Sequence, residues 1–182
     1  MRVITGSARG RKLETLPGPI TRPTTDMVKE AVFNIIQFDI EGRRVLDLFA
    51  GSGQMGIEAL SRGAREAVFV DQKAEAIRVI RRNLEKTGFV KNAQVFLSDA
   101  FSWLSGGRGQ FDLIFIDPPY MTNHIEKALN IIRKFDILSD GGIIICESSE
   151  TKPTPAAQEP LRLLKEYKYG KIKISLFNKG VV

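Results

Sequence analysis

The chain has 182 residues, 43% of them hydrophobic, and a formal net charge of +6 at pH 7. This length fits one domain with a small appendage, and the hydrophobic content suffices for a sizeable core. No apolar run approaches the roughly 20 residues that span a bilayer, and the basic start lacks an apolar signal region, so we expect a cytoplasmic protein. The excess positive charge favours a polyanionic partner, of which nucleic acid is the commonest.

The single cysteine, Cys146, cannot form an internal disulfide, which fits a reducing compartment. It ends the apolar run 143–146, and this position predicts a small buried core residue. No histidine lies nearby in sequence to activate a thiol, so a catalytic cysteine is not favoured. No metal site is predicted.

The amino-terminal segment has the pattern of a basic-tipped hairpin. Two short stretches suited to strands, at 3–5 and 12–16, flank the turn-forming stretch 6–10. We expect residues 1–20 to form this extension and residues 21–182 to form the main domain. The segment carries no acid before its second run, so it concentrates positive charge.

A helix is predicted next, with Thr24 or Thr25 suited to cap it and apolar residues from Val28 to Ile36 on one face. From Arg44 onward strands and helices alternate, which implies a mostly parallel sheet with helices on both faces. The predicted strands are 45–49, 67–71, 94–97, 111–116 and 143–147.

The last third of the chain contains less regular signals. Asn123 and Glu126 resemble a capping pair for a helix, and His124 beside them is expected to be solvated. A short helix is predicted around Leu161 and Leu164, followed by a strand pair through 171–177. Upstream, Trp103 is expected to pack against the sheet.

The loop after the first predicted strand matches the dinucleotide fingerprint G-x-G-x-x-G at Gly51, Gly53 and Gly56. Asp71 ends the second predicted strand, where ribose hydroxyls are usually bound. A nicotinamide-dependent oxidoreductase is therefore one interpretation of this loop.

Asp47, four residues before the first glycine, favours a different cofactor. A carboxylate there would repel the two phosphates of a dinucleotide in a partly dehydrated cleft. S-adenosylmethionine carries a sulfonium and an ammonium group and no phosphate, and its ribose still needs an acid such as Asp71. Asp99, after the third predicted strand, is suited to accept from the adenine amine. Helix capping and loop solvation are the ordinary alternative for each of these acids.

The stretch Asp117-Pro118-Pro119-Tyr120 follows the fourth predicted strand. Two prolines cannot continue the hydrogen-bond ladder, so the strand must stop there. In open α/β sheets ligands bind at this carboxyl end. The acid and the Pro118 carbonyl can accept hydrogen bonds, and Tyr120 can stack on a flat ring. This combination suits a planar group held by its exocyclic amine; the ordinary alternative is a proline turn with a buried tyrosine.

Together these patterns resemble the class I methyltransferases, because 47–53 looks like their first motif and 117–120 looks like the motif of amino-group methyltransferases. The chain is further similar to the bacterial RsmD family from Arg2 to about Phe177. The additional stretches that carry this similarity are 21–26, 60–64 and 169–171. Gln54-Met55 departs from the smaller or more apolar residues expected there.

The resemblance implies a Rossmann-like α/β fold with a mostly parallel seven-stranded sheet and a small amino-terminal hairpin. It also implies methyl transfer from S-adenosylmethionine to the exocyclic N2 of one guanine in 16S ribosomal RNA. The RNA is then expected within a small ribosomal subunit particle, and the enzyme is expected to be a monomer.

Site residues are assigned from the loops and the resemblance together. The expected catalytic residues are Asp117, Pro118, Pro119 and Tyr120. The expected cofactor contacts are Thr24, Thr25, Asp47, Phe49, Ala50, Gly51, Ser52, Gly53, Asp71, Gln72, Asp99 and Ala100. The expected RNA contacts are Arg9, Arg11, Lys12 and Arg22, with a solubilising surface as the ordinary alternative. Further lysines of the carboxyl-terminal part are Lys165, Lys168, Lys171, Lys173 and Lys179.

Three other functions remain open at this point. An adenine-N6 DNA methyltransferase would use the same proline loop. A nicotinamide-dependent oxidoreductase would use the same glycine loop. A non-catalytic RNA-binding protein would keep the scaffold without the chemistry.

Overall fold

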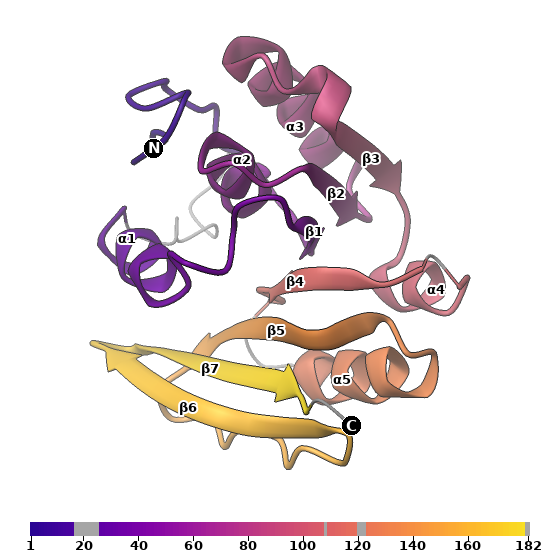
Figure 1. Cartoon of the computed structure of the whole chain (residues 1–182). Helices are drawn as coiled ribbons and strands as arrows, with labels where there is room; N and C mark the ends of the chain where they lie inside the picture. The colour runs from indigo at the N-terminus through magenta and orange to yellow at the C-terminus, as the bar shows by residue number, and fades with distance from the viewer. Residues whose placement is uncertain (17–25, 108, 120–122, 181–182) are drawn as a thin grey trace.

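The computed structural model of the chain describes residues 1–16, 26–107, 109–119 and 123–180. Arg22, Thr24, Thr25 and Tyr120 lie outside the described residues. Five α-helices and seven strands lie within the described ranges (Figure 1). The helices are α1 (Asp26–Ile35), α2 (Gln54–Ser61), α3 (Ala74–Thr87), α4 (Ala100–Leu104) and α5 (His124–Lys134). The strands are β1 (Arg44–Leu48), β2 (Glu66–Asp71), β3 (Ala93–Leu97), β4 (Phe111–Ile116), β5 (Leu138–Ser149), β6 (Leu161–Tyr169) and β7 (Ile172–Lys179).

The strands form one seven-stranded sheet in the order β3-β2-β1-β4-β5-β7-β6. The first five in this order are parallel, and β7 and β6 add an antiparallel ribbon beside β5. The predicted fold, an α/β sheet of seven mostly parallel strands with helices, is confirmed. Within the described ranges, no helix is both long and apolar enough to cross a membrane.

The predicted short helix around Leu161 and Leu164 is wrong, because these residues belong to the edge strand β6. Their spacing of three imitates a helical face, but Leu164 is 53% exposed and packs into no core. The register of β6 against β7 shifts between Leu163 and Lys165, which is the irregularity of a β-bulge. An extra residue in a strand breaks the period-two pattern by which strands are predicted.

Two hydrophobic layers cover the sheet. The first joins residues of α1, α2 and α3 to one face of the strands, and the second joins α4 and α5 to the other face. Figure 1 shows this division, with α1, α2 and α3 on one side and α4 and α5 on the other. Trp103 and Cys146 are 3% and 2% exposed in the second layer, which confirms both predictions of burial.

The amino-terminal segment 1–14, here called the arm, lies against α2 and α3. It forms a single antiparallel bridge, between Arg2 and Lys12, so the strands of the predicted hairpin are reduced to one pair of residues. The arm buries Val3, Ala8 and Leu13 in the first hydrophobic layer. Its backbone amides find partners both within the arm and on α2 and α3.

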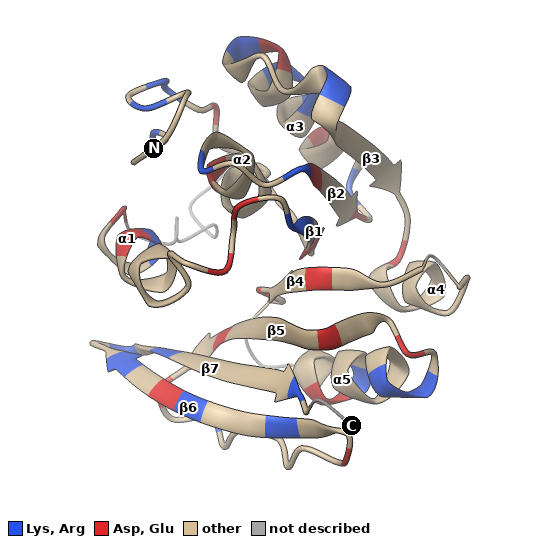
Figure 2. Ribbon diagram, in the orientation of Figure 1, with Lys and Arg blue, Asp and Glu red and all other residues tan. Residues whose placement is uncertain are grey.

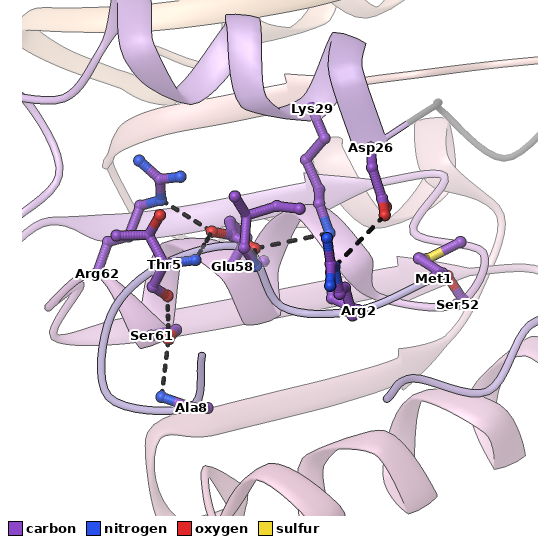
Figure 3. A network of polar contacts seen from close by, with 12 residues as sticks. Met1, Arg2, Thr5, Ala8, Asp26, Lys29, Ser52, Glu58, Ser61 and Arg62 are labelled. Atoms are coloured by element: carbon purple, nitrogen blue, oxygen red, sulfur yellow. Dashed lines mark hydrogen bonds and ion pairs between the residues drawn. The ribbon is translucent and has the colours of Figure 1, made fainter. Parts of the chain in front are cut away.

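Glu58 of α2 is the main anchor of the arm (Figure 3). Its side chain is fully buried, and it accepts the Ile4 amide at 2.8 Å and the Thr5 amide at 3.0 Å. The Nζ of Lys29, also fully buried, lies 3.6 Å from the same carboxylate, and Arg62 Nε donates to it at 2.9 Å. A buried charge is thus shared among two cations and two backbone amides, which fixes the arm on α2.

Candidate active site

The glycine loop and the proline loop leave the sheet from neighbouring strands. Leu48 and Ile116, the last residues of β1 and β4, are paired in the parallel register. The loops 49–53 and 117–119 therefore begin side by side at the carboxyl edge. From β1 the chain continues to β2 and β3 on one side of the sheet and then crosses back to β4 on the other side of β1. The edge between β1 and β4 is therefore the topological switch point, where α/β sheets bind ligands.

Asp71 holds the glycine loop from β2. Its Oδ2 accepts the Gly51 amide at 2.9 Å, and its Oδ1 accepts the Lys73 amide at 2.9 Å. Gly51 and Gly53 have φ values of 55° and 77°, and Phe49 also has a positive φ of 63°. For phenylalanine that conformation is strained, so the surrounding contacts must enforce it.

Asp47 lies under the same loop and is 3% exposed. Its Oδ2 accepts the amide of Gly56, in the first turn of α2, at 2.9 Å. Burial raises the pKa of Asp47 to about 7; the Gly56 hydrogen bond opposes this shift and the charge of Asp71 adds to it. A Cβ on Gly56 would lie 2.4 Å from Cε1 of Phe69, so glycine is needed for this close approach of α2 to β2.

A row of acids continues across the carboxyl edge. Asp117 follows β4 and is half-buried, and Glu147 on the neighbouring strand β5 is 8% exposed. The pKa of Asp117 is raised well above its usual range, first by burial, then by the charge of Glu147 and then by that of Asp47. Sequence reasoning assigns Glu147 no role. The sequence does contain a signal for it: Glu147 lies two positions after Ile145, so a charged residue shares a face with the apolar residues of a buried strand.

Three aromatic rings border this edge on the α5 side. The imidazole of His124 stacks on Phe49 with centroids 5.7 Å apart and an interplanar angle of 1°. Phe101 meets both rings edge-on, and Lys127 Nζ lies 4.0 Å from its centroid. His124 is partly buried, so the prediction of a solvated histidine is wrong. Sequence distance hides this contact, because the three rings come from three separate elements.

Two predicted capping residues behave differently from one another. Asp99 is exposed and caps α4, accepting the amides of Phe101 at 3.1 Å and Ser102 at 2.9 Å. The Ser102 amide bond contributes most to holding the pKa of Asp99 below its usual value. Capping is thus one role of Asp99, and its contact with adenine stays a prediction. Asn123 precedes α5 but its side chain makes no capping hydrogen bond, so that prediction is wrong.

The remaining predicted site residues fall at the same edge. Ala50, Ser52, Gly53, Ala100 and Pro118 are buried, whereas Gln72 and Pro119 are exposed. Gln54 is 8% exposed, and its Oε1 has no hydrogen-bond partner among the described residues. Met55 is half-buried and packs on the first hydrophobic layer. Within the described ranges, no group of three or more His, Cys, Asp or Glu residues is placed to hold a metal ion.

The fold and this edge define a class I methyltransferase, a class whose cofactor is S-adenosylmethionine. The edge fits that cofactor in two respects. A Cβ added to Gly51 would meet no atom within 4 Å, so space adjoins the glycine loop. The buried carboxylate of Asp47 and its acidic neighbours suit a ligand with a sulfonium and an ammonium group.

The chain belongs to the family described as conserved hypothetical protein 95, whose family model matches residues 1–178. It is 40% identical to Bacillus subtilis YlbH, provisionally named an rRNA methyltransferase, over 98% of this chain and 99% of that protein. It is 34% identical to ribosomal RNA small subunit methyltransferase D of Escherichia coli K12, over 98% and 90% of the two chains. The solved structure of Escherichia coli yhhF, provisionally named a methyltransferase, matches with a TM-score of 0.90, 33% identity and 99% and 98% coverage.

The raised pKa of Asp47 predicts a pH dependence of cofactor affinity. A cationic ligand favours the ionised carboxylate of Asp47, whereas in the ligand-free protein Asp47 is protonated below about pH 7. S-adenosylmethionine affinity should therefore rise with pH up to about pH 7, with a limiting slope of about tenfold per pH unit for one proton; above that, the ligand's own α-ammonium begins to lose its proton. Calorimetric titrations from pH 5.5 to 8.5 measure this.

Asp47→Asn is the control for that titration. The asparagine keeps an acceptor for the Gly56 amide but cannot ionise. The affinity of this variant for S-adenosylmethionine should therefore be lower than that of the wild type and should vary less with pH. Asp117 titrates in the same direction and leaves a residual slope. An unchanged pH profile in Asp47→Asn would contradict the role of Asp47 in binding the cationic cofactor.

Proposed function

We propose that this protein transfers a methyl group from S-adenosylmethionine to the exocyclic N2 amine of a guanine in 16S ribosomal RNA. The observation that carries the proposal is the pairing of Leu48 with Ile116, which starts the cofactor loop and the proline loop side by side. The relative from Escherichia coli named ribosomal RNA small subunit methyltransferase D supports the choice of RNA.

The proline loop would hold the nucleophile. When bound, the cofactor supplies a methyl group on a sulfonium, which is already strongly electrophilic. A guanine amine shares its lone pair with the ring and is a poor nucleophile. Asp117 and the Pro118 carbonyl would each accept one N–H, which turns the lone pair toward the methyl group. These acceptors bind the amine more tightly as it becomes positive, so they stabilise the transition state preferentially.

Two further residues of the loop complete the proposal. Pro118 is buried and, with Pro119, limits backbone freedom, so the carbonyl stays aimed. Tyr120 would stack on the base, and the target nucleotide must be unpaired or flipped to enter. Asp117 is also placed to receive the departing proton, although water suffices for that step.

The arm would contact the RNA backbone. Arg9, Arg11 and Lys12 are exposed at its turn, and Arg11 Nη1 donates to the carbonyl of Lys86 near the end of α3 at 3.0 Å. Figure 2 shows cationic residues both on the arm and along α3. Phosphates are contacted without regard to sequence, so this surface would position the RNA and the proline loop would select the base.

Two lysines of the carboxyl-terminal part do not belong to such a surface. Lys173 is 5% exposed, lies 3.6 Å from Glu166 and donates to the carbonyl of Lys152. Lys179 is 8% exposed and lies 2.7 Å from both Asp136 and Asp140. Both cations are buried and already paired, so they are not available to RNA.

Salt titration tests the arm. Replacing Arg9 and Lys12 together by alanine should lower the slope of log affinity against log salt by about 0.7–0.9 for each RNA phosphate that the variant no longer neutralises. Arg133→Ala is the matched control, because this exposed arginine lies in the last turn of α5, which packs in the other hydrophobic layer from the arm. Equal slopes for all three proteins in filter-binding assays would remove the arm from the RNA interface.

Two alternatives receive less support. For a nicotinamide-dependent oxidoreductase, the amides of the first turn of α2 would bind pyrophosphate, but the Gly56 amide is already bound by the carboxylate of Asp47. An adenine-N6 DNA methyltransferase fits the proline loop but not the ribosomal RNA relative. We further propose a small-subunit particle as substrate, a monomeric enzyme and a cytoplasmic location, where ribosomes assemble.

The test uses labelled S-adenosylmethionine with small-subunit particles and with 16S RNA from cells that lack this protein. We expect label in N2-methylguanosine at one position, recovered by nuclease digestion and nucleoside chromatography. Duplex DNA is the parallel substrate. Label only in DNA, or in a nucleoside other than N2-methylguanosine, would overturn the proposal.

A further inference from the structure

Asn83 of α3 is a fully buried amide with three hydrogen bonds to other segments. Its Oδ1 accepts the Glu14 amide at 2.8 Å. Its Nδ2 donates to the Glu14 carbonyl at 3.0 Å and to the Ser52 carbonyl at 3.0 Å. One side chain thus joins the end of the arm to the glycine loop.

The arm reaches the glycine loop from its other end as well. Ser52 Oγ lies 3.7 Å from the sulfur of Met1, and Figure 3 shows these two side chains together. Between the two ends, Glu58 fixes the arm on α2, the helix that begins directly after the loop. The arm therefore reaches Ser52 of the glycine loop at both of its ends. Met1 contacts Ser52 directly, and Glu14 is linked to Ser52 through Asn83.

The Ser52–Gly53 peptide is held on both sides. Asn83 binds the Ser52 carbonyl, and the Gly53 amide donates to the Ala50 carbonyl at 2.7 Å. Ser52 is 8% exposed, so a carbonyl freed from Asn83 would be left largely without solvent. The peptide would then rotate toward another donor. Because Gly53 has a left-handed φ of 77°, little steric resistance opposes that rotation.

We propose that Asn83 is a positioning residue for the cofactor: it fixes the glycine loop in its binding conformation and makes the arm a brace for that loop. The inference rests on the proposed function, because it takes the glycine loop as the cofactor site. It goes beyond the proposed function because the arm receives a second role, separate from RNA contact. In that role the backbone of Glu14 holds the side chain of Asn83 against the glycine loop.

Calorimetric titration with S-adenosylhomocysteine tests the proposal without any turnover. Asn83→Ala should raise the dissociation constant about tenfold, since the variant cannot form the buried hydrogen bond to the loop. With S-adenosylmethionine and RNA, KM for the cofactor should rise while kcat at saturation stays within about twofold. Asn83→Ser serves as a second, smaller change should the alanine variant fail to fold.

Two controls separate positioning from stability. Thr87→Ala removes a buried hydroxyl that donates, among the described residues, to the Asn83 and Leu84 carbonyls of α3, so it should lower the melting temperature and leave S-adenosylhomocysteine affinity unchanged. Arg82→Ala removes one ion pair to the Glu14 carboxylate and leaves both backbone bonds between Glu14 and Asn83 in place, so its affinity for S-adenosylhomocysteine should stay near that of the wild type. Wild-type affinity in the folded Asn83 variants would overturn the inference. Absent binding by the wild type would instead reject the cofactor assignment, and this inference with it.

Discussion

Asp117→Ala is expected to lower the rate of methyl transfer about a thousandfold, the scale measured when one preorganised hydrogen-bonding group is removed from a transition state. The alanine cannot accept an N–H, so the amine lone pair stays in conjugation with the ring. Single-turnover transfer of labelled methyl to small-subunit RNA measures the loss. S-adenosylhomocysteine affinity should change far less, because the glycine loop is intact.

The conservative variant sharpens this prediction. Asp117→Asn keeps one oxygen that can accept an N–H, so it should retain more activity than alanine. It also removes an ionisable group whose pKa is raised by burial and by two neighbouring acids, so the fold should be no less stable. Asp140→Ala is the matched control. It removes an exposed acid that pairs with Lys179, and Lys179 keeps its second ion pair, to Asp136. Turnover of Asp117→Ala close to that of this control would exclude Asp117 from the chemistry.

The parallel part of the fold could be predicted from the sequence because its signals are local. Strand β4 is predicted as 111–116 and observed as Phe111–Ile116, since a continuous apolar run ends at two prolines. The glycine loop is similarly local, and the alternation of strands and helices then places both loops at one edge. The α/β fold class and the location of the site at the carboxyl edge of the sheet follow from these local features, without any information on long-range contacts.

The errors arise where distant contacts or irregular geometry decide. Strand β6 is not predicted because a bulge breaks its alternation. His124 is misassigned because Phe49, which it stacks on, lies 75 residues earlier in the sequence, as the two residue numbers show. Asn83 and Glu58 give no signal, because a polar residue on a helix is ordinarily solvated, whereas these two are buried by the arm and by other segments distant in sequence.

Glu58→Ala is expected to reduce the free energy of unfolding by about 3–5 kcal/mol, the range found when one partner of a buried ion pair is removed. Burial lowers the pKa of Lys29, and the Glu58 carboxylate now partly offsets this effect. In the variant, Lys29 would remain fully buried without that carboxylate. Two arm amides would also lose their acceptor. Chemical denaturation at pH 7 measures the loss. Glu58→Gln, which keeps one acceptor oxygen, should lose less.

A double variant separates the charge from the anchoring. In Lys29→Met/Glu58→Leu both fully buried charges are removed and Arg62, which is 11% exposed, is the cation that loses its carboxylate partner, so much of the stability should return relative to Glu58→Ala. The arm amides of Ile4 and Thr5 still lack an acceptor, and Lys29 no longer donates to the Arg2 carbonyl. The arm should therefore stay loose and be cut by trypsin at its exposed basic turn faster than in the wild type. Slow cleavage in the double variant would mean that the buried apolar residues of the arm hold it in place without Glu58.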